Sequence, residues 1–130
     1  MTVPLNPAGV RPPFGRYSHG IAATGVTEVV VTSGQLGVAV DDTVPESVAA
    51  QAEICFESIG RILAEAGLGF GDIVRLNAYV TRREDMRDYM AVRDRYVREP
   101  LPASTLVIVS GFTRPEFLVE VEATAVRSSG

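Results

Sequence analysis

Alternating apolar and polar positions predict strands in the second half of this chain. Between residues 72 and 80 every second side chain is apolar. Between residues 117 and 126, Glu120 and Glu122 occupy alternate positions in a run of Val, Leu, Ala and Thr. Side chains two apart on a strand point to the same face, so we expect both carboxylates on one face of a sheet. The β-branched run at 102–110 indicates another strand.

Proline and glycine recur through the first third of the chain and indicate turns and loops there. Residues 1–16 contain four prolines, and we interpret them as an irregular lead-in. The stretches 17–23 and 28–33 flank Gly25 and predict a hairpin. The hairpin ends in Ser33-Gly-Gln-Leu-Gly37. Its two glycines allow backbone paths that other residues resist, and they can leave N–H groups directed at a ligand.

A three-and-four spacing of apolar residues predicts two helices. The first follows Thr43-Val-Pro-Glu46, which has the spacing of a capping box, and it ends at Gly67 and Leu68. The second follows Thr81-Arg-Arg-Glu84, which has the same spacing. The side chains spaced along the second helix are Met86, Tyr89, Met90, Arg93, Tyr96 and Val97.

The order of these elements is β-β-α-β-α-β-β, which indicates an α+β fold in a single domain spanning residues 1–130. With so few elements, the economical arrangement places both amphipathic helices on one face of a single sheet. The other face is then uncovered, although several strands are apolar or mixed on both sides. We therefore expect a homo-oligomer with pockets between subunits.

Composition narrows the possible partners and the compartment. The formal net charge of −4 gives no general attraction to nucleic acid or anionic lipid. With one cysteine, Cys55, and one histidine, His19, the chain has no Cys/His set for zinc and no internal disulfide. Cys55 falls on the buried stripe of the first helix and is expected to be unreactive. The sequence shows neither a leader pattern nor a long apolar run, so we expect a cytoplasmic protein.

Short motifs along nearly the whole chain resemble the Rid family of reactive intermediate deaminases, also called YjgF. They are Phe14–Gly20 with Tyr17, Thr32-Ser-Gly-Gln-Leu36, Gln51-Ala-Glu53, Ala66-Gly-Leu68 with Gly71–Val74, Pro102-Ala103 and Val119–Ala125. The order and spacing of the motifs carry the resemblance. It implies a chorismate-mutase-like fold, a homotrimer whose sheets form a central barrel, and three ligand clefts between neighbouring subunits.

The resemblance also implies a chemistry. Deaminase-type members hydrolyse reactive enamines and imines, such as 2-aminoacrylate and 2-iminopropionate, to keto acids and ammonia without a cofactor. Glu120 is similar to the glutamate that positions the attacking water in these proteins. By the same resemblance Ser33 and the amide of Gly34 line the cleft, and Tyr17 closes it.

Three ligand-site positions depart from the family pattern. Deaminase-type members carry arginine directly after the Pro-Ala pair, where its planar fork grips the substrate carboxylate. This chain has Ser104 there, and it has Leu106 and Met90 where cysteine and asparagine are often found. We therefore expect a divergent member with a changed anchor. Three arginines in loops are candidates for a displaced cation: Arg11, Arg16 and Arg114.

Three functions follow in order of preference. The first is a hydrolase of enamine or imine type acting on a small reactive metabolite. The second is a trimer that binds a small metabolite without turning it over, which the residues at 104, 106 and 90 favour. The third is an endoribonuclease, which is disfavoured by the negative net charge and by the presence of only one histidine.

Each proposed site residue also has a structural interpretation. Without the resemblance, Glu120 would be interpreted as a solvated glutamate on a strand. Ser33 and Gly34 would be turn residues, and Tyr17 would be an aromatic ring of the core. Glu122 is expected at the surface or in a subunit contact, and His19 at the surface.

Overall fold

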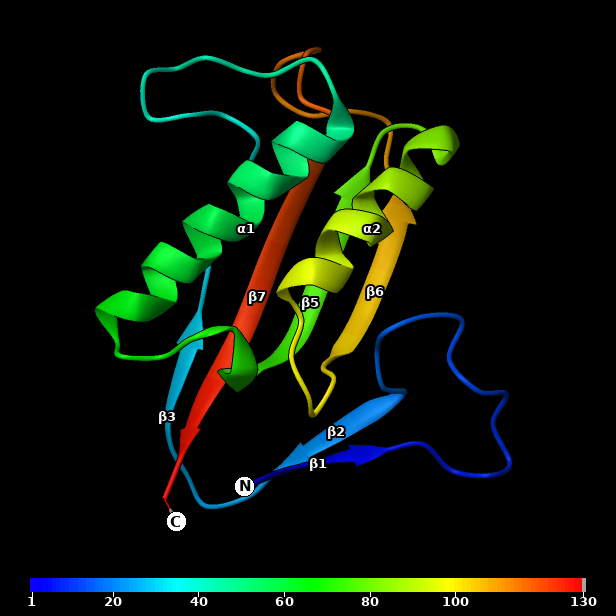
Figure 1. Ribbon diagram of the computed structural model, residues 1–130, viewed down its shortest axis with the longest axis vertical. Helices are drawn as coiled ribbons and strands as arrows, with labels where there is room; N and C mark the ends of the chain where they lie inside the picture. The colour runs from blue at the N-terminus through cyan, green and yellow to red at the C-terminus, as the bar shows by residue number, and fades with distance from the viewer. Residues whose placement is uncertain (130) are drawn as a thin grey trace.

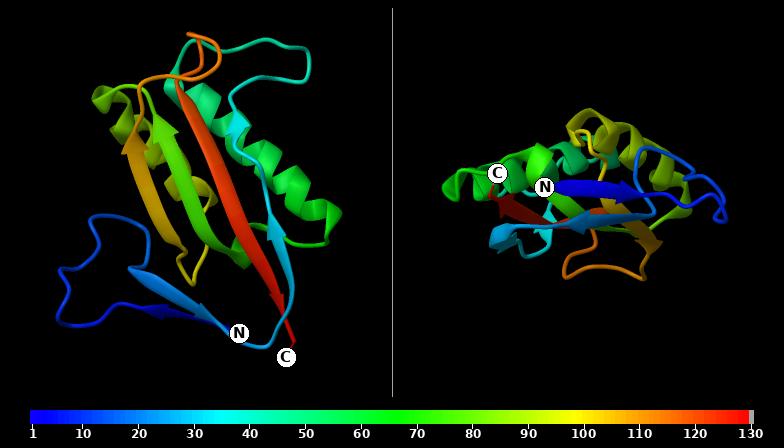
Figure 2. Two further views of the ribbon diagram at one scale, coloured as in Figure 1. Left: turned by 180° about the vertical axis from the view of Figure 1, so that it is seen from behind. Right: turned by 90° about the horizontal axis from the view of Figure 1, so that it is seen from below.

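The computed structural model describes residues 1–129 and has two layers. Both long helices lie on one face of a five-stranded mixed sheet (Figures 1 and 2). This arrangement confirms the predicted α+β class with two helices on one face. The helices are α1 (Val48–Glu65) and α2 (Met86–Tyr96), and the strands of the sheet are β3 (Val26–Val31), β4 (Gln35–Leu36), β5 (Ile73–Val80), β6 (Ala103–Ile108) and β7 (Val119–Ser128).

The last strand of the chain, β7, is at the centre of the sheet. The strand order is β3-β7-β5-β6, and β4 pairs with β7 beyond the end of β3. β7 runs antiparallel to β3, β4 and β5, whereas β5 and β6 are parallel. The parallel pair requires a crossover connection, which α2 supplies. The core lies between the sheet and the helices, where β7 packs against α1.

The predicted N-terminal hairpin is wrong. β2 (Gly20–Ala23) does not pair with β3 but with β1 (Thr2–Leu5), in a separate two-stranded sheet. The segment 1–16 therefore begins with a strand rather than being irregular throughout. Pro4 fits there because an edge strand leaves backbone positions free of ladder bonds. The partner of β3 is β7, which lies about ninety residues further along the chain.

The ends of α1 correct one prediction and agree with another. The N-cap is Ser47, whose hydroxyl accepts a hydrogen bond from the amide of Ala50 at 3.1 Å. Thr43, expected to form a capping box, instead donates its hydroxyl to Asp41 in a turn. At the other end Gly67 has a φ of 73°, and the Leu68 amide reaches the Leu63 carbonyl at 2.9 Å. This is the glycine-capped end that the sequence predicts.

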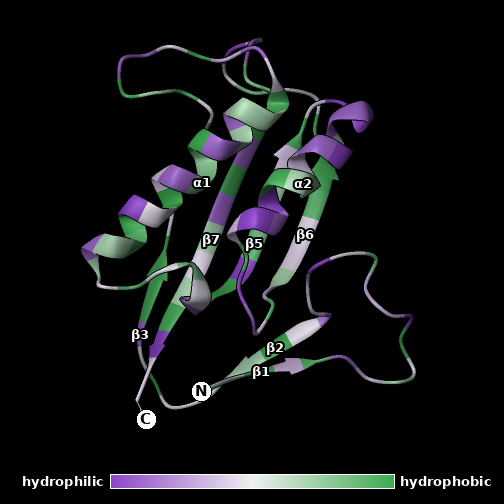
Figure 3. Cartoon of the chain, in the orientation of Figure 1, coloured by the Kyte–Doolittle hydropathy of each residue, from purple (hydrophilic) through white to green (hydrophobic). Residues whose placement is uncertain are grey.

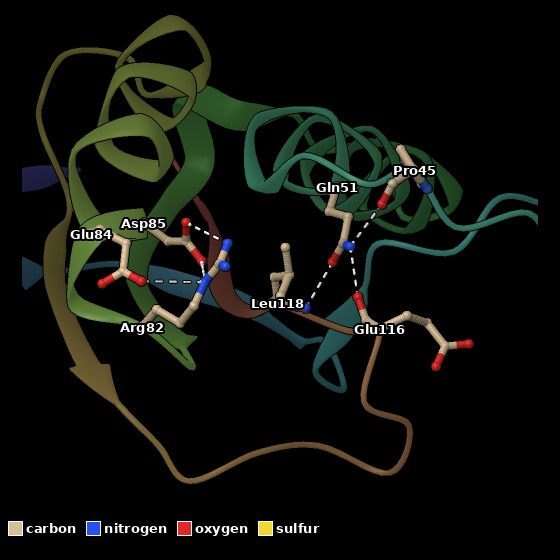
Figure 4. A network of polar contacts seen from close by, with 7 residues as sticks. All are labelled: Pro45, Gln51, Arg82, Glu84, Asp85, Glu116 and Leu118. Carbon is tan, nitrogen blue, oxygen red and sulfur yellow. Dashed lines mark hydrogen bonds and ion pairs between the residues drawn. The ribbon is translucent and has the colours of Figure 1, made fainter.

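The start of α2 also differs from the prediction. No capping-box hydrogen bond forms at Thr81 within the described residues. The chain makes a short 3-10 turn, η2 (Arg83–Asp85), and a second one, η1 (Phe70–Asp72), precedes β5. Arg82 instead donates to the buried carboxylate of Asp85 from two nitrogens, at 2.8 and 3.0 Å (Figure 4).

The face of the sheet opposite the helices carries exposed apolar side chains. β3 is largely hydrophobic in Figure 3, and Val31 is 70% exposed. Val29 is exposed on the same face of β3, and Val107 is exposed at the other edge of the sheet. Within residues 1–129, no helix combines the length and the apolar character needed to cross a bilayer.

Candidate functional site

Glu120 and Glu122 lie on the open face of β7, as the alternation predicts. Their neighbours Val119, Val121 and Ala123 are buried beneath the helices, whereas both glutamates are partly exposed. Glu120 is level with Tyr79 of β5 and with Leu36 of β4. The strand pairing therefore holds both carboxylates on the surface that the helices leave uncovered.

Gly34 is packed directly against Glu120. A Cβ atom built on Gly34 would lie 2.6 Å from Glu120 Cδ, closer than real Cβ contacts allow. Gly34 is not among the residues with positive φ, so its role is close approach rather than an unusual backbone path. The adjacent Ser33 is exposed, and its carbonyl accepts a hydrogen bond from the Gln35 side chain. Ser33, Gly34 and Glu120 are thus brought together at the β3–β4 junction.

The two glutamates of β7 differ in their partners. Glu122 accepts hydrogen bonds from the Tyr79 hydroxyl at 3.2 Å and from Asn77 Nδ2 at 3.4 Å. Burial, and after it the neighbouring Glu122 carboxylate, raises the pKa of Tyr79. Among residues 1–129, the Glu120 carboxylate has no hydrogen bond or ion pair. Glu120 is consequently free to accept a hydrogen bond from water or a ligand.

Gln51 of α1 fixes the loop before α1 and the segment that leads into β7, a role that the sequence did not predict. Its buried side chain donates to the carbonyls of Pro45 and Glu116, at 2.8 and 2.9 Å (Figure 4). Its Oε1 accepts from the Leu118 amide at 2.9 Å. Gly37 lies so close that a Cβ there would be 2.3 Å from Gln51 Cβ. One amide therefore ties the start of β7 to the loop that precedes α1.

The remaining predicted ligand residues lie on the other side of the sheet. Ser104 and Leu106 are level with Leu76 and Ala78 of β5, which are buried beneath the helices. Leu106 packs against the hydrophobic core, and so does Met90 on α2. These side chains therefore belong to the layer between α2 and β6.

Tyr17 lies near this second group. The following residue, Ser18, donates its amide to the Pro102 carbonyl at 2.9 Å and forms a bridge with Ala103. The Tyr17 hydroxyl accepts from the Phe14 amide at 3.1 Å. Tyr17 is thus held close to Pro102 and Ala103 at the start of β6.

The predicted site residues form two groups that one chain does not join. Ser33, Gly34 and Glu120 are at the β4–β7 side, and Glu120 faces away from the helices. Ser104, Leu106 and Met90 face the helix layer at the β6 edge, and β5 separates β6 from β7. The chain therefore presents the predicted site residues as two groups on opposite faces of the sheet.

The residues considered as accessory groups lie in exposed loops. His19 Nε2 is within hydrogen-bonding reach of the Arg11 carbonyl, and the Arg11 guanidinium lies 3.9 Å from the centre of the Phe14 ring. Arg16 is exposed as well. Arg114 pairs with Glu116 at 3.2 Å and lines a cavity of about 380 Å³ with Phe112 and Phe117.

A cavity of about 860 Å³ lies between α1 and the loop at 38–45. It is lined by Val38, Val40, Ile54 and Glu57, among others, and contains none of the predicted site residues. No cluster of three or more potential metal ligands occurs among residues 1–129. Cys55 is buried, and burial raises its pKa to about 12, so its thiol is protonated at neutral pH.

Comparison with known proteins identifies the family. The family model described as endoribonuclease L-PSP matches residues 8–127. A curated relative, the 2-iminobutanoate/2-iminopropanoate deaminase of Escherichia coli strain K12, is 31% identical over 118 residues, covering 88% of this chain and 89% of the relative. This chain belongs to the Rid family. The expectation drawn from the dispersed motifs is confirmed.

Solved structures of Rid proteins have the same fold. The crystal structure of E. coli TdcF with bound serine matches with a TM-score of 0.71 at 30% identity, covering 89% of this chain and 91% of TdcF. The Rid protein YyfB from Yersinia pestis matches with a TM-score of 0.82 over 97% of this chain and 98% of YyfB. At 24% identity, that second likeness shows the fold alone.

Proposed function

We propose that this Rid protein is a cofactor-independent hydrolase of small enamines or imines, with Glu120 as the residue that holds the attacking water. The observation that carries the proposal is the Glu120 carboxylate, which is fixed against Gly34 and has no protein partner among residues 1–129. The names of the relatives support it, because one is a deaminase of 2-iminobutanoate and 2-iminopropanoate. A related structure contains bound serine, a small amino acid.

The reaction needs only a positioned water and a proton acceptor. Glu120 accepts a proton from water as the water oxygen bonds to the imine carbon and the C=N electron pair moves to nitrogen. Glu120 then returns the proton to the departing nitrogen. The hydroxyl proton is then transferred to nitrogen through Glu120 as the C–N bond breaks, so that ammonia leaves and the hydroxyl oxygen becomes the carbonyl oxygen of a keto product. Fixing the carboxylate against the Gly34 backbone supplies the orientation on which such a step depends.

The proposal places the complete site between neighbouring subunits of a homotrimer. Glu120, Ser33 and Gly34 come from one subunit, and Tyr17, Ser104, Leu106 and Met90 come from the next. The exposed Val29, Val31 and Val107 support self-association through the open face, because apolar patches of this kind are typical of protein contacts. The separation of the two half-sites within one chain is consistent with this arrangement.

The test is the rate of 2-iminopropionate hydrolysis, with the imine generated by an amino-acid oxidase and semicarbazide present as a competing trap. We expect acceleration by the wild-type protein and a loss of about 100-fold or more in Glu120→Ala. Glu122→Gln is the matched control, because Glu122 is already hydrogen-bonded to Tyr79 and Asn77. Undiminished turnover in Glu120→Ala would refute the role of this carboxylate.

A trimer that binds without turnover is the second function. The half-buried side chains of Leu106 and Met90 favour it, because these apolar residues bring no polar group to the proposed ligand site. Saturable binding of pyruvate by a folded protein that does not accelerate imine hydrolysis would select this function over the first.

A further inference from the structure

Arg93 is a largely buried cation with one charged protein partner, and its Nη1 is not among the fully buried polar atoms that lack a hydrogen bond within residues 1–129. Its side chain is 4% exposed, although it carries a full charge. Nε and Nη2 both donate to one oxygen of Asp94, at 3.3 and 3.1 Å, and Nη1 has no acceptor within residues 1–129. Asp94 is the next residue on the helix and is 40% exposed, so it is a partly solvated partner. A buried guanidinium with five donors is costly unless more acceptors are supplied.

Arg93 lies beside the segment 15–18, which leads to β2 and bonds to the start of β6. A Cβ built on Gly15 would be 3.2 Å from Arg93 Nη2, so the guanidinium touches the backbone of this segment. The amide of Tyr17 bonds to the Gly15 carbonyl at 3.0 Å, and Ser18 bonds to Pro102 immediately before β6. The buried charge is thus held next to Tyr17 and the first residues of β6.

Two further ligand-site residues belong to the same layer. Met90 precedes Arg93 by three positions on α2, so the two side chains are neighbours on one face of the helix. Ser104 projects from β6 into the layer that α2 covers, since it is level with the buried Leu76. Arg93 is therefore the buried cation of the half-site formed by Tyr17, Met90 and Ser104.

We propose that Arg93 binds the carboxylate of the ligand, and that the ligands of this protein are consequently small carboxylates. The inference rests on the proposed function for the identity of the half-site. Nη1 has N–H donors without an acceptor among residues 1–129, and Nη2 donates to Asp94 together with Nε. A ligand carboxylate beside Nη1 and Nη2 would accept hydrogen bonds from both nitrogens, as in a bidentate arginine–carboxylate pair.

The other arginines near the half-sites are less suited to this task. The Arg11 guanidinium is exposed and covers the Phe14 ring, and Arg114 is paired with Glu116. Exposed cations attract a carboxylate weakly, because water and salt screen the charge. Arg93 has the low exposure that strengthens such an interaction.

Binding of pyruvate, compared with binding of its uncharged amide pyruvamide, tests the proposal without requiring turnover. We expect Arg93→Gln to weaken pyruvate binding about 10- to 100-fold and to leave pyruvamide binding unchanged. Arg93→Lys keeps the charge without the fork and should fall between wild type and Arg93→Gln. Arg95→Gln is the matched control, since Arg95 is an exposed arginine of α2 paired with Glu53.

A second measurement covers the case in which Arg93→Gln fails to fold. In the wild-type protein, the side-chain Nε–H resonance of Arg93 should shift with pyruvate and saturate at the same concentration as binding. Equal pyruvate affinity in wild type and Arg93→Gln would overturn the proposal. An Arg93 resonance that pyruvate leaves unmoved, or a wild type that prefers pyruvamide, would overturn it as well.

The outcomes for Arg93 and Glu120 are separable. If Glu120→Ala abolishes turnover but still binds pyruvate through Arg93, both assignments hold. If no turnover is seen and pyruvate binding still depends on Arg93, the hydrolase proposal fails and the carboxylate site stands. If turnover depends on Glu120 but neither turnover nor pyruvate binding depends on Arg93, the present inference alone fails.

Discussion

Polar side chains on the helix-covered face of the sheet and on its open face differ in how fully they are hydrogen-bonded. Beneath α1, Gln51 is fully buried and makes three hydrogen bonds to backbone groups. On the open face, Glu120 is partly exposed and has no partner in the described chain. A satisfied buried amide contributes to the stability of the fold, whereas a fixed but unpaired carboxylate is available for chemistry. Arg93 is the exception on the covered side, because its donors are only partly used.

The largest expected effect on the covered face is that of Gln51→Leu. Leucine fills a similar volume but leaves two carbonyls and one amide without their partner. We expect the free energy of unfolding to fall by about 3 kcal/mol or more, measured by urea denaturation. Glu53→Gln is the control on the same helix, because it removes only a surface ion pair and should change stability by less than about 1 kcal/mol. Equal effects of the two changes would contradict the role of Gln51.

On the open face, Gly34→Ala should reduce turnover with a much smaller effect on folding. The new methyl group would occupy the position of the Glu120 carboxyl, so the carboxylate must move. A displacement of this size is expected to lower kcat/KM for 2-iminopropionate by about 100-fold. Gly9→Ala is the control, since a Cβ there meets nothing within 4 Å. Full activity in Gly34→Ala would show that the exact position of Glu120 is unimportant.

A smaller effect should appear in the pH dependence of stability, through Cys55. Burial raises its pKa from 9.0 to about 12, so the folded state holds the thiol proton more tightly than the unfolded state. This contribution is fully present below pH 9 and is lost as the pH rises from 9 towards 12. Urea unfolding of wild type and Cys55→Val across that range should show the steeper loss in wild type. Parallel pH profiles would contradict the assignment.

Local patterns were enough to predict much of the framework. The spacing of apolar residues indicates both helices, and the Gly67–Leu68 pair marks the end of α1 because its chemistry is local. The alternation in β7 places Glu120 and Glu122 on one face. The pairing of β3 with β7 could not be read in this way, since it joins segments far apart in the chain. β1 was hidden because Pro4 is typical of loops as well as of edge strands.

The candidate site was less accessible to sequence reasoning. The residues at 17, 33, 34, 104 and 120 came from a resemblance, but their division between two faces depends on strand register. The sequence identifies Arg93 only as one of the side chains spaced along the second helix, and its proximity to Gly15 arises from tertiary packing. The function of Gly34 is likewise a matter of contact with Glu120 rather than of backbone φ.

The central claim is that each site combines residues of two subunits, and mixed assemblies test it most directly. Glu120→Ala, which should lose turnover, and Arg93→Gln, which should bind the substrate more weakly, would be co-expressed with different tags. The mixed oligomers would be isolated and assayed at a substrate concentration at which Arg93→Gln alone turns over little. Each mixed trimer contains the two variants in a 2:1 or 1:2 ratio, so about one third of its sites should combine an intact Glu120 with an intact Arg93, with turnover to match. Turnover no greater than that of the separate variants would contradict a shared site.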